Sequence, residues 1–534
     1  MKSAAHRPSS APIPCSIAVF VAISVALSLG LAACGGSRGV ATGGGSNPPP
    51  PPPPPTQFLT HQDVDALVQA AATAAQSSTM AIAVVDRLGV ILAVYQGPSA
   101  PATVAGNFGA AVPPAELAVS LARTGAFFSA DQSPLSSRTV RFISGIHFPP
   151  GVANAPNAAL YGIENTNRGC TLSPGLNATI PPAGLINGSR PGLGVATGKA
   201  DVNDSDPTAV NPGGVPIFKN GEMVGGIGVA GVDPLTAEFA AFTATQNNFD
   251  GMVLPAIPPP GEVVIDGVAL PFVDQTTAPA GTTPGTFSPA NYIQTPIDSA
   301  GPPPDGFLIA ATNGPLGGLT AAQVNSIILN AVATANLTRA LIRLPVGVRA
   351  KMSIAVSDLD GTIIGLYRMT DGTVFSVDVA ATKARNVIYF SGPNRQPQDL
   401  NQVPIGTAVT NRTIGFGAQP LFPPGINSSQ PGPFFNLYTQ DTANPCTQGF
   451  QVPSASWPAI NQSGIVFFPG SEPLYVNGQL VGGLGVSGDG VDQDDYVTAG
   501  GAAGFEAPAA IQADQITIAG VRLPYLHFPR NPTQ

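Results

Sequence analysis

Residues 216–231 read PIFKNGEMVGGIGVAG, and residues 473–488 repeat the phrase as PLYVNGQLVGGLGVSG. Each copy contains an Asn-Gly dipeptide, which favours a type I′ hairpin turn because both central residues of that turn need positive φ. The apolar residues after the turn predict a buried strand, and strand alternation places Gly226 and Gly228 on one face. Glycine inside a strand often marks a close approach of another group to the backbone. We expect a helix of the same domain to pack against this bare face, with a flat ligand or the sister copy as the alternatives.

The repetition extends over most of the chain. Three further segments occur twice: an amphipathic helix, a pair of strands and an alanine-rich helix. They are residues 59–75 and 319–335, 81–95 and 353–367, and 116–129 and 378–391. This order predicts an α+β fold with two tandem domains, each a mainly antiparallel sheet packed with helices on one face.

The repeat also sets the expected domain boundaries. Residues 58–275 form the first domain, with an insertion and a tail, and residues 319–528 form the second domain with its own tail. Between them, residues 276–318 are rich in Pro and Gly and predict a linker. Because two copies of one unit in a chain can mimic a homodimer, we expect the copies to pack as a pseudo-dimer.

The N-terminal 57 residues predict export and anchoring. Residues 1–33 combine basic residues with an apolar run that is short for a membrane span, which is typical of a signal peptide. The sequence LAAC, which ends at Cys34, resembles a bacterial lipobox with an acylated cysteine; an ordinary cleaved signal peptide is the alternative. Residues 34–57 form a Gly/Ser and polyproline tether. We therefore expect a bacterial outer-membrane lipoprotein, attached through its N-terminal lipid and either periplasm-facing or surface-exposed.

Composition and motifs argue against several classes of function. The net charge is −9 and no basic cluster occurs, so nucleic acid is a poor candidate partner. No histidine is shared by both copies, so we interpret His61, His147 and His527 as surface or satisfied side chains and predict no metal site. The sequence has no hydrolase, zinc-protease or P-loop motif, and we assign no catalytic residue.

The repeated segments, in this order, resemble the GlcG/HbpS-like family of secreted haem-binding and glycolate-operon proteins. The resemblance rests on IAVVDRLGVILAVY, VAATKARNVIYF and the glycine-rich hairpin, and it covers most of both copies. It implies compact α/β sandwiches with a mainly antiparallel sheet, often assembled as oligomers. It also implies haem or a related tetrapyrrole as the candidate ligand and cofactor.

The resemblance places the candidate ligand site on the alanine-rich helix. Haem-binding relatives carry a lysine there and, three residues later, a threonine implicated in ligation. The second copy has Lys383 followed by Asn386, whereas the first copy keeps only the threonine, Thr124. Arg123 and Arg385 occur in both copies and are candidates to pair with propionates, a solvated helix face being the alternative. The site is expected more in the second copy, because of Lys383.

The sequence is compatible with three functions. Binding of a small molecule, with haem as the leading candidate, is favoured over catalysis. The alternatives are an enzyme of undetermined reaction on small hydroxy or keto acids, and a surface scaffold or adhesion module.

Two cysteines lie in matching loops, one in each copy. Cys170 and Cys446 therefore have no partner within their own domain, and the exported location permits a disulfide between the copies. Two free thiols are the alternative.

Overall fold

The structure, a computed structural model, describes residues 56–106, 110–168, 170, 212–295, 298–299, 301–444, 446–449 and 461–534. All of them lie in one unit of the chain, Pro55–Gln534. The predicted signal peptide, Cys34, most of the tether and most of the insertion lie outside the described residues. Among the described residues, no helix has the length and apolar character needed to cross a membrane.

Each half of this unit is built on a five-stranded antiparallel sheet. The first sheet has the order β5-β6-β1-β2-β9, and the second has the equivalent order β13-β14-β11-β12-β10. The strands of the first sheet are β1 (Ala81–Asp86), β2 (Ile91–Gln96), β5 (Gly214–Lys219), β6 (Glu222–Ala230) and β9 (Tyr292–Gln294). Those of the second are β10 (Gly306–Ile309), β11 (Ser353–Ser357), β12 (Ile363–Arg368), β13 (Ser471–Val476) and β14 (Gln479–Ser487).

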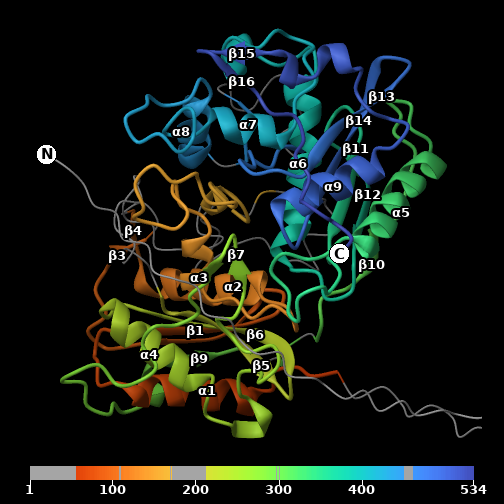
Figure 1. The fold of residues 1–534 in the computed structure, drawn as a ribbon. Helices are drawn as coiled ribbons and strands as arrows, with labels where there is room; N and C mark the ends of the chain where they lie inside the picture. Colours follow the sequence, from red (N-terminus) through yellow and green to blue (C-terminus); the bar gives the residue numbers. More distant parts are fainter. Residues whose placement is uncertain are drawn as a thin grey trace, which may run out of the picture. The chain divides into compact units, whose positions relative to one another are not determined.

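Helices cover both faces of each sheet, which corrects the expectation of helices on one face. In the first half, α1 (His61–Ala74) and α4 (Pro234–Ala244) cover one face and α2 (Pro114–Phe128) covers the other (Figure 1). In the second half, α5 (Ala321–Leu337) and α9 (Val491–Gly501) lie opposite α6 (Phe375–Ser391). The reason is that the central strands are apolar on both faces: every residue of β1 and β11 is buried.

The first helix of each half begins two residues into the segment that the repeat assigns to it. Thr60 is the N-cap of α1 and Thr320 that of α5, and each forms a capping box with the residue three positions on, Asp63 or Gln323. These boxes satisfy backbone N–H groups that the first turn of a helix leaves without partners.

The glycine face of the repeated hairpin is closed by the alanine-rich helix. A Cβ atom on Gly228 would lie 1.9 Å from the carbonyl oxygen of Ala118 in α2, and one on Gly485 would lie 2.1 Å from that of Ala380 in α6. No side chain fits into such a gap. The glycines of β6 and β14 therefore allow direct contact between strand and helix backbones.

The stretch 276–318 is not only a linker, although its composition predicts one. It supplies β9, which pairs with β2, and β10, which pairs with β12. These edge strands are short and follow no apolar alternation, so the sequence pattern does not reveal them. The remaining elements are β3 (Val104–Ala105), β4 (Ala111–Val112), α3 (Ser137–Phe142), β7 (Val264–Ile265), β8 (Val268–Ala269), α7 (Asn411–Gly417), α8 (Phe435–Ala443), β15 (Thr517–Ile518) and β16 (Val521–Arg522).

Residues of the two halves contact one another within this unit. The rings of Tyr161 and Tyr438 stack with centroids 5.0 Å apart. The structure joins Cys170 and Cys446 in a disulfide with a Cα–Cα distance of 5.2 Å. Tyr161 and Tyr438 begin the matching sequence segments and the cysteines end them, so in both pairs a residue meets its own counterpart; the second segment, expected as a loop, begins within α8.

Candidate functional site

Lys383 lies on α6 and is completely buried. Its ammonium donates to Asp494 Oδ2 at 3.0 Å and to the carbonyl oxygen of Val486 at 2.8 Å. Its Nζ also lies 4.9 Å from the centre of the Phe468 ring. Burial lowers the pKa of Lys383 and raises that of Asp494 to about 7, while each group favours the charged form of the other. Lys383 thus ties α6 to α9 and β14.

The two shared arginines have the same structural role in each half. Arg123 Nε donates to the carbonyl oxygen of Gly89 at 2.9 Å, and Arg385 Nε donates to that of Gly361 at 2.8 Å. Both glycines lie in the turn of the first hairpin and have positive φ, near +80°. The arginines therefore fasten the alanine-rich helix to this turn. Burial lowers the pKa of both guanidinium groups to about 10.

Asn386 and Thr124 also make internal contacts. Asn386 donates to the carbonyl oxygen of Gly464 at 2.8 Å and accepts from the Val466 amide at 3.0 Å. The hydroxyl of Thr124 donates to the carbonyl oxygen of Ser120, one turn back on α2, at 2.8 Å. The structure thus brings the second-copy candidates, Lys383, Arg385 and Asn386, onto one buried helix. None of the five candidate side chains lines any of the three cavities described below.

A cavity of about 440 Å³ lies away from this helix core, among residues of both halves. Its walls include the aromatic rings of Phe148, Phe416 and Phe467. Among its lining residues, His527 and Arg412 have basic side chains. Apolar walls with a few convergent polar groups are typical of small-molecule sites, and this volume is within their usual range of about 300–1,000 Å³.

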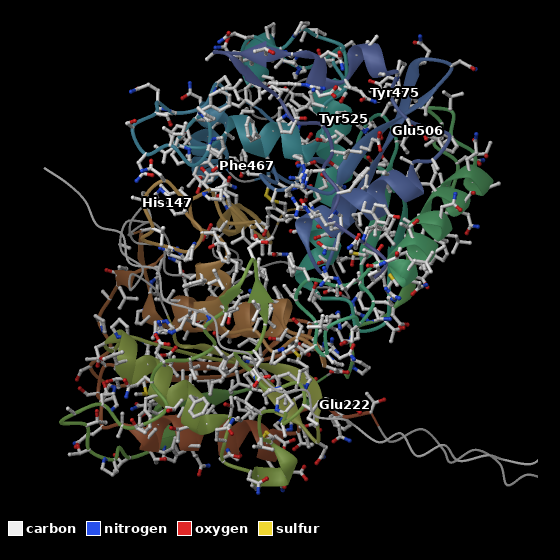
Figure 2. The ribbon with its side chains drawn as sticks, in the orientation of Figure 1. His147, Glu222, Phe467, Tyr475, Glu506 and Tyr525 are labelled. Carbon is white, nitrogen blue, oxygen red and sulfur yellow. A yellow bond between two sulfur atoms is a disulfide. The ribbon has the colours of Figure 1, made fainter. Side chains whose placement is uncertain are left out.

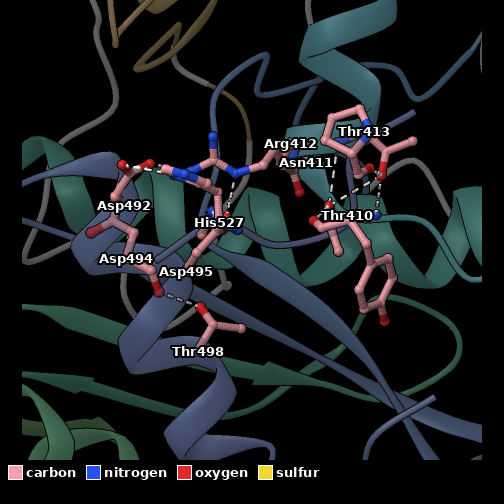
Figure 3. A network of polar contacts seen from close by, with 12 residues as sticks. Thr410, Asn411, Arg412, Thr413, Asp492, Asp494, Asp495, Thr498 and His527 are labelled. Atoms are coloured by element: carbon pink, nitrogen blue, oxygen red, sulfur yellow. Dashed lines mark hydrogen bonds and ion pairs between the residues drawn. The ribbon is translucent and has the colours of Figure 1, made fainter. Parts of the chain in front are cut away.

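His527 is held by the acidic face of α9 (Figure 3). Its Nδ1 lies 2.9 Å from Asp492 Oδ2, and its backbone amide donates to Asp495 Oδ2 at 3.0 Å. Arg412 bridges the same two carboxylates, from NH2 to Asp492 at 2.5 Å and from Nε to Asp495. A carboxylate on one ring nitrogen orients the imidazole and leaves the other nitrogen, Nε2, to face a ligand. That nitrogen has no recorded hydrogen-bond partner among the described residues.

The other two histidines of the described chain have partners outside this cavity. His61 contacts Asp298 at 2.5 Å through Nδ1 and the carbonyl oxygen of Thr295 at 2.9 Å through Nε2. His147 Nε2 lies 2.8 Å from Asn427 Oδ1. No group of three or more metal-binding side chains is found among the described residues.

The sequence does not single out His527 as a site residue. It has no histidine counterpart, since Asp274 occupies the matching position, where it pairs with Arg138 at 2.8 Å. Comparing the two copies could have drawn attention to His527. Arg138 and Arg412 occupy matching positions, but the tail residue near Arg138 is Asp274 and the one near Arg412 is His527.

One family model matches part of the chain, within its second half. Residues 319–503, from before α5 to just beyond α9, match the family model described as "Haem degrading protein HbpS-like". The resemblance stated from the sequence is therefore confirmed for this half. No curated protein matches the chain.

Two solved structures also resemble part of the chain. A crystal structure of the Klebsiella pneumoniae protein ORFY (family model DUF336) is 17% identical, with 35% of this chain and 88% of that chain covered and a TM-score of 0.22. A crystal structure of a PduOC:heme complex is 18% identical, with 36% and 96% covered and a TM-score of 0.23. Both TM-scores are low, so neither likeness indicates a function for this chain.

Proposed function

We propose that the protein is an exported, lipid-anchored protein that binds a small molecule, with haem or a related tetrapyrrole as the leading candidate. The observation that carries the proposal is the cavity in which His527, oriented by Asp492, stands beside aromatic walls. The family description of residues 319–503 names haem and supports this choice of ligand. Export and anchoring rest on the signal sequence and on Cys34.

The residues around the cavity fit haem in two respects. A neutral imidazole is a common axial ligand of haem iron, and His527 presents Nε2 for that role. Phe148, Phe416 and Phe467 offer apolar surface for a flat macrocycle. The iron and the macrocycle would supply the redox or oxygen chemistry, while the chain supplies the ligand and its orientation.

The charges around His527 limit how haem could bind. Arg412 already pairs with Asp492 and Asp495, and Asp266 also lines the cavity. The lining of the cavity therefore offers no surplus positive charge to pair with the propionates of haem. The expected mode of binding is therefore led by the axial ligand rather than by the propionates.

We further propose that the two halves pack as a pseudo-dimer. Two contacts between equivalent residues support this, Tyr161 with Tyr438 and Cys170 with Cys446. In a twofold interface, residues near the axis contact the same residue of the other copy.

Haem titration tests the proposed ligand. The Soret band of haem should shift when it is added to the wild type, and the shift should be lost in His527→Ala. His61→Ala is the matched control, because His61 also contacts an aspartate but does not line the cavity. No shift with the wild type would contradict haem binding and return the enzyme and scaffold alternatives to first place.

A further inference from the structure

A second cavity, of about 630 Å³, lies in the second half between β13, α9 and the C-terminal tail. Glu472 of β13, Ala499 of α9, and Tyr525 and Phe528 of the tail are among its lining residues. Figure 2 shows Tyr525, Tyr475 and Glu506 in the same part of the second half. Pro524 is the single lining residue that this cavity shares with the one around His527.

Glu472 is a buried carboxyl group in the wall of this cavity. It is 2% exposed, and Oε1 accepts a long hydrogen bond of 3.3 Å from the hydroxyl of Tyr525. Oε2 is buried and has no hydrogen-bond partner among the described residues. Burial raises the pKa of Glu472 to about 8, and the Tyr525 hydrogen bond opposes this only in part. Ionising a buried carboxyl group that has no cation beside it is costly, so a cationic ligand in this cavity would supply the partner that ionised Glu472 needs.

The charge around Glu472 favours a cation. The cavity is also lined by the carboxylates of Glu506 and Asp514. Its one guanidinium, on Arg522, is already held by Asp514 at 2.6 Å. The rings of Tyr525 and Phe528 add electron-rich faces, which attract organic ammonium groups.

The first half has a matching cavity that lacks a residue equivalent to Glu472. This cavity, of about 700 Å³, lies between α4 and the matching tail residues Leu270, Pro271 and Phe272. Val215 occupies the position of Glu472, and no carboxyl side chain is among the lining residues. The fold therefore accommodates an apolar residue at this position, and Glu472 is not required to close the core.

We propose that the cavity of the second half binds a small organic ammonium ion, whose N–H groups donate to Glu472 while its carbon chain lies against Tyr525 and Phe528. The ligand supplies the cation that the buried carboxylate lacks. Because Arg522 offsets the charge of Asp514, Glu506 supplies the remaining long-range attraction for a cation. The net negative charge of the lining disfavours anions, and the apolar side chains of Leu523 and Leu526 disfavour strongly hydrated metal ions.

The proposal predicts proton release on binding. The groups that act on Glu472 are Tyr525 through its hydrogen bond and the carboxylates of Glu506 and Asp495 through their charge; Asp514, Arg522 and Tyr475 are the other titratable side chains nearby. At pH 7 the free protein holds Glu472 protonated, and pairing with an ammonium ion ionises it. Binding should release about one proton at pH 7, and affinity should rise roughly tenfold from pH 6 to pH 7.

Calorimetric titration of the full mature chain with n-butylammonium chloride tests the proposal, with 1-butanol as the neutral analogue. Titrations in two buffers of different ionisation enthalpy count the released protons. Glu472→Gln removes the charge at constant shape, and Glu472→Val installs the residue of the first half. Glu222→Gln, a change on the hairpin of the first half away from this cavity (Figure 2), is the control for net charge.

The proposal expects butylammonium binding with proton release in the wild type and in Glu222→Gln, and at least a tenfold loss of affinity in both Glu472 variants. No binding by the wild type, equal binding by Glu472→Gln, or equal binding of 1-butanol would overturn it. The Val variant keeps the test decisive even if the Gln variant fails to fold. Haem titration of the same proteins reports on the other cavity, so failure of one proposal is distinguishable from failure of the other.

Discussion

Substituting Lys383 tests whether the alanine-rich helix of the second half carries a structural ion pair or a ligand site. In the first half, Leu121 occupies the position of Lys383, and Ala237 occupies that of its partner Asp494. Both Leu121 and Ala237 are buried in their half. The first half therefore shows that the same helix packing accommodates an apolar pair, Leu121 and Ala237, at these two positions.

Lys383→Leu leaves Asp494 buried without its cation. Removing one partner of a buried ion pair typically costs about 3–5 kcal/mol of unfolding free energy, because Asp494 must then stay buried either as an unpaired carboxylate or as a protonated group without its hydrogen bond from Lys383. The double variant Lys383→Leu/Asp494→Ala should recover most of this loss, since replacing both partners of such a pair by apolar residues is often neutral or stabilising by about 1–4 kcal/mol.

Denaturant unfolding at pH 7 of the wild type, both single variants and the double variant gives the coupling free energy. Asp494→Ala alone should also destabilise, because it leaves the Lys383 ammonium buried. The reasoning is refuted if Lys383→Leu is as stable as the wild type, or if the double variant is no more stable than the single ones.

Three further predictions concern other parts of the chain. Burial raises the folded-state pKa of Glu472 from its ordinary value of 4.5 to about 8, so the stabilising contribution of this group is complete below about pH 4.5 and is lost as the pH rises to 8. In that window the free energy of unfolding of Glu472→Gln should increase relative to the wild type by about 1.4 kcal/mol per pH unit. Unfolding measured from pH 5 to 8 checks this, and a stability difference that does not change with pH would contradict it. Peptide mapping without reduction should recover Cys170 linked to Cys446, and alkylation of both thiols in the unreduced protein would exclude the bond. Cys34→Ala should leave the membrane fraction, whereas continued dependence on detergent would argue against lipid anchoring.

Much of the secondary structure follows from local patterns in the sequence. The capping boxes at Thr60 and Thr320 mark the helix starts, and Asn-Gly marks the turn of each repeated hairpin. The glycines of that hairpin indicate a close approach, which the structure assigns to the alanine-rich helix. By contrast, β9 and β10 are edge strands that pair through backbone hydrogen bonds with strands far away in the sequence. Their side chains show no pattern that would predict this pairing.

The candidate site could be predicted much less well than the fold. Helical position alone does not show that Lys383 meets Asp494, because the two residues are 111 positions apart. Comparing the two copies does indicate this contact, because both positions change together: Lys383 and Asp494 in the second copy are Leu121 and Ala237 in the first. Glu472 has a similar signal: it is a lone acid where the matching strand has Val215. His527 lies beyond the matched family region, so the resemblance gives no guidance there.

The most direct test of the account is the affinity for haem of two variants measured side by side. His527→Ala removes the proposed axial ligand from the cavity, and Lys383→Leu/Asp494→Ala removes the charges from the helix while keeping its packing. Absorbance titration of each variant against the wild type at pH 7 compares the two places. The account predicts that the His527 variant loses at least tenfold in affinity and that the double variant binds as the wild type does. The opposite pattern, loss in the double variant and none in His527→Ala, would contradict the cavity and restore the helix as the site.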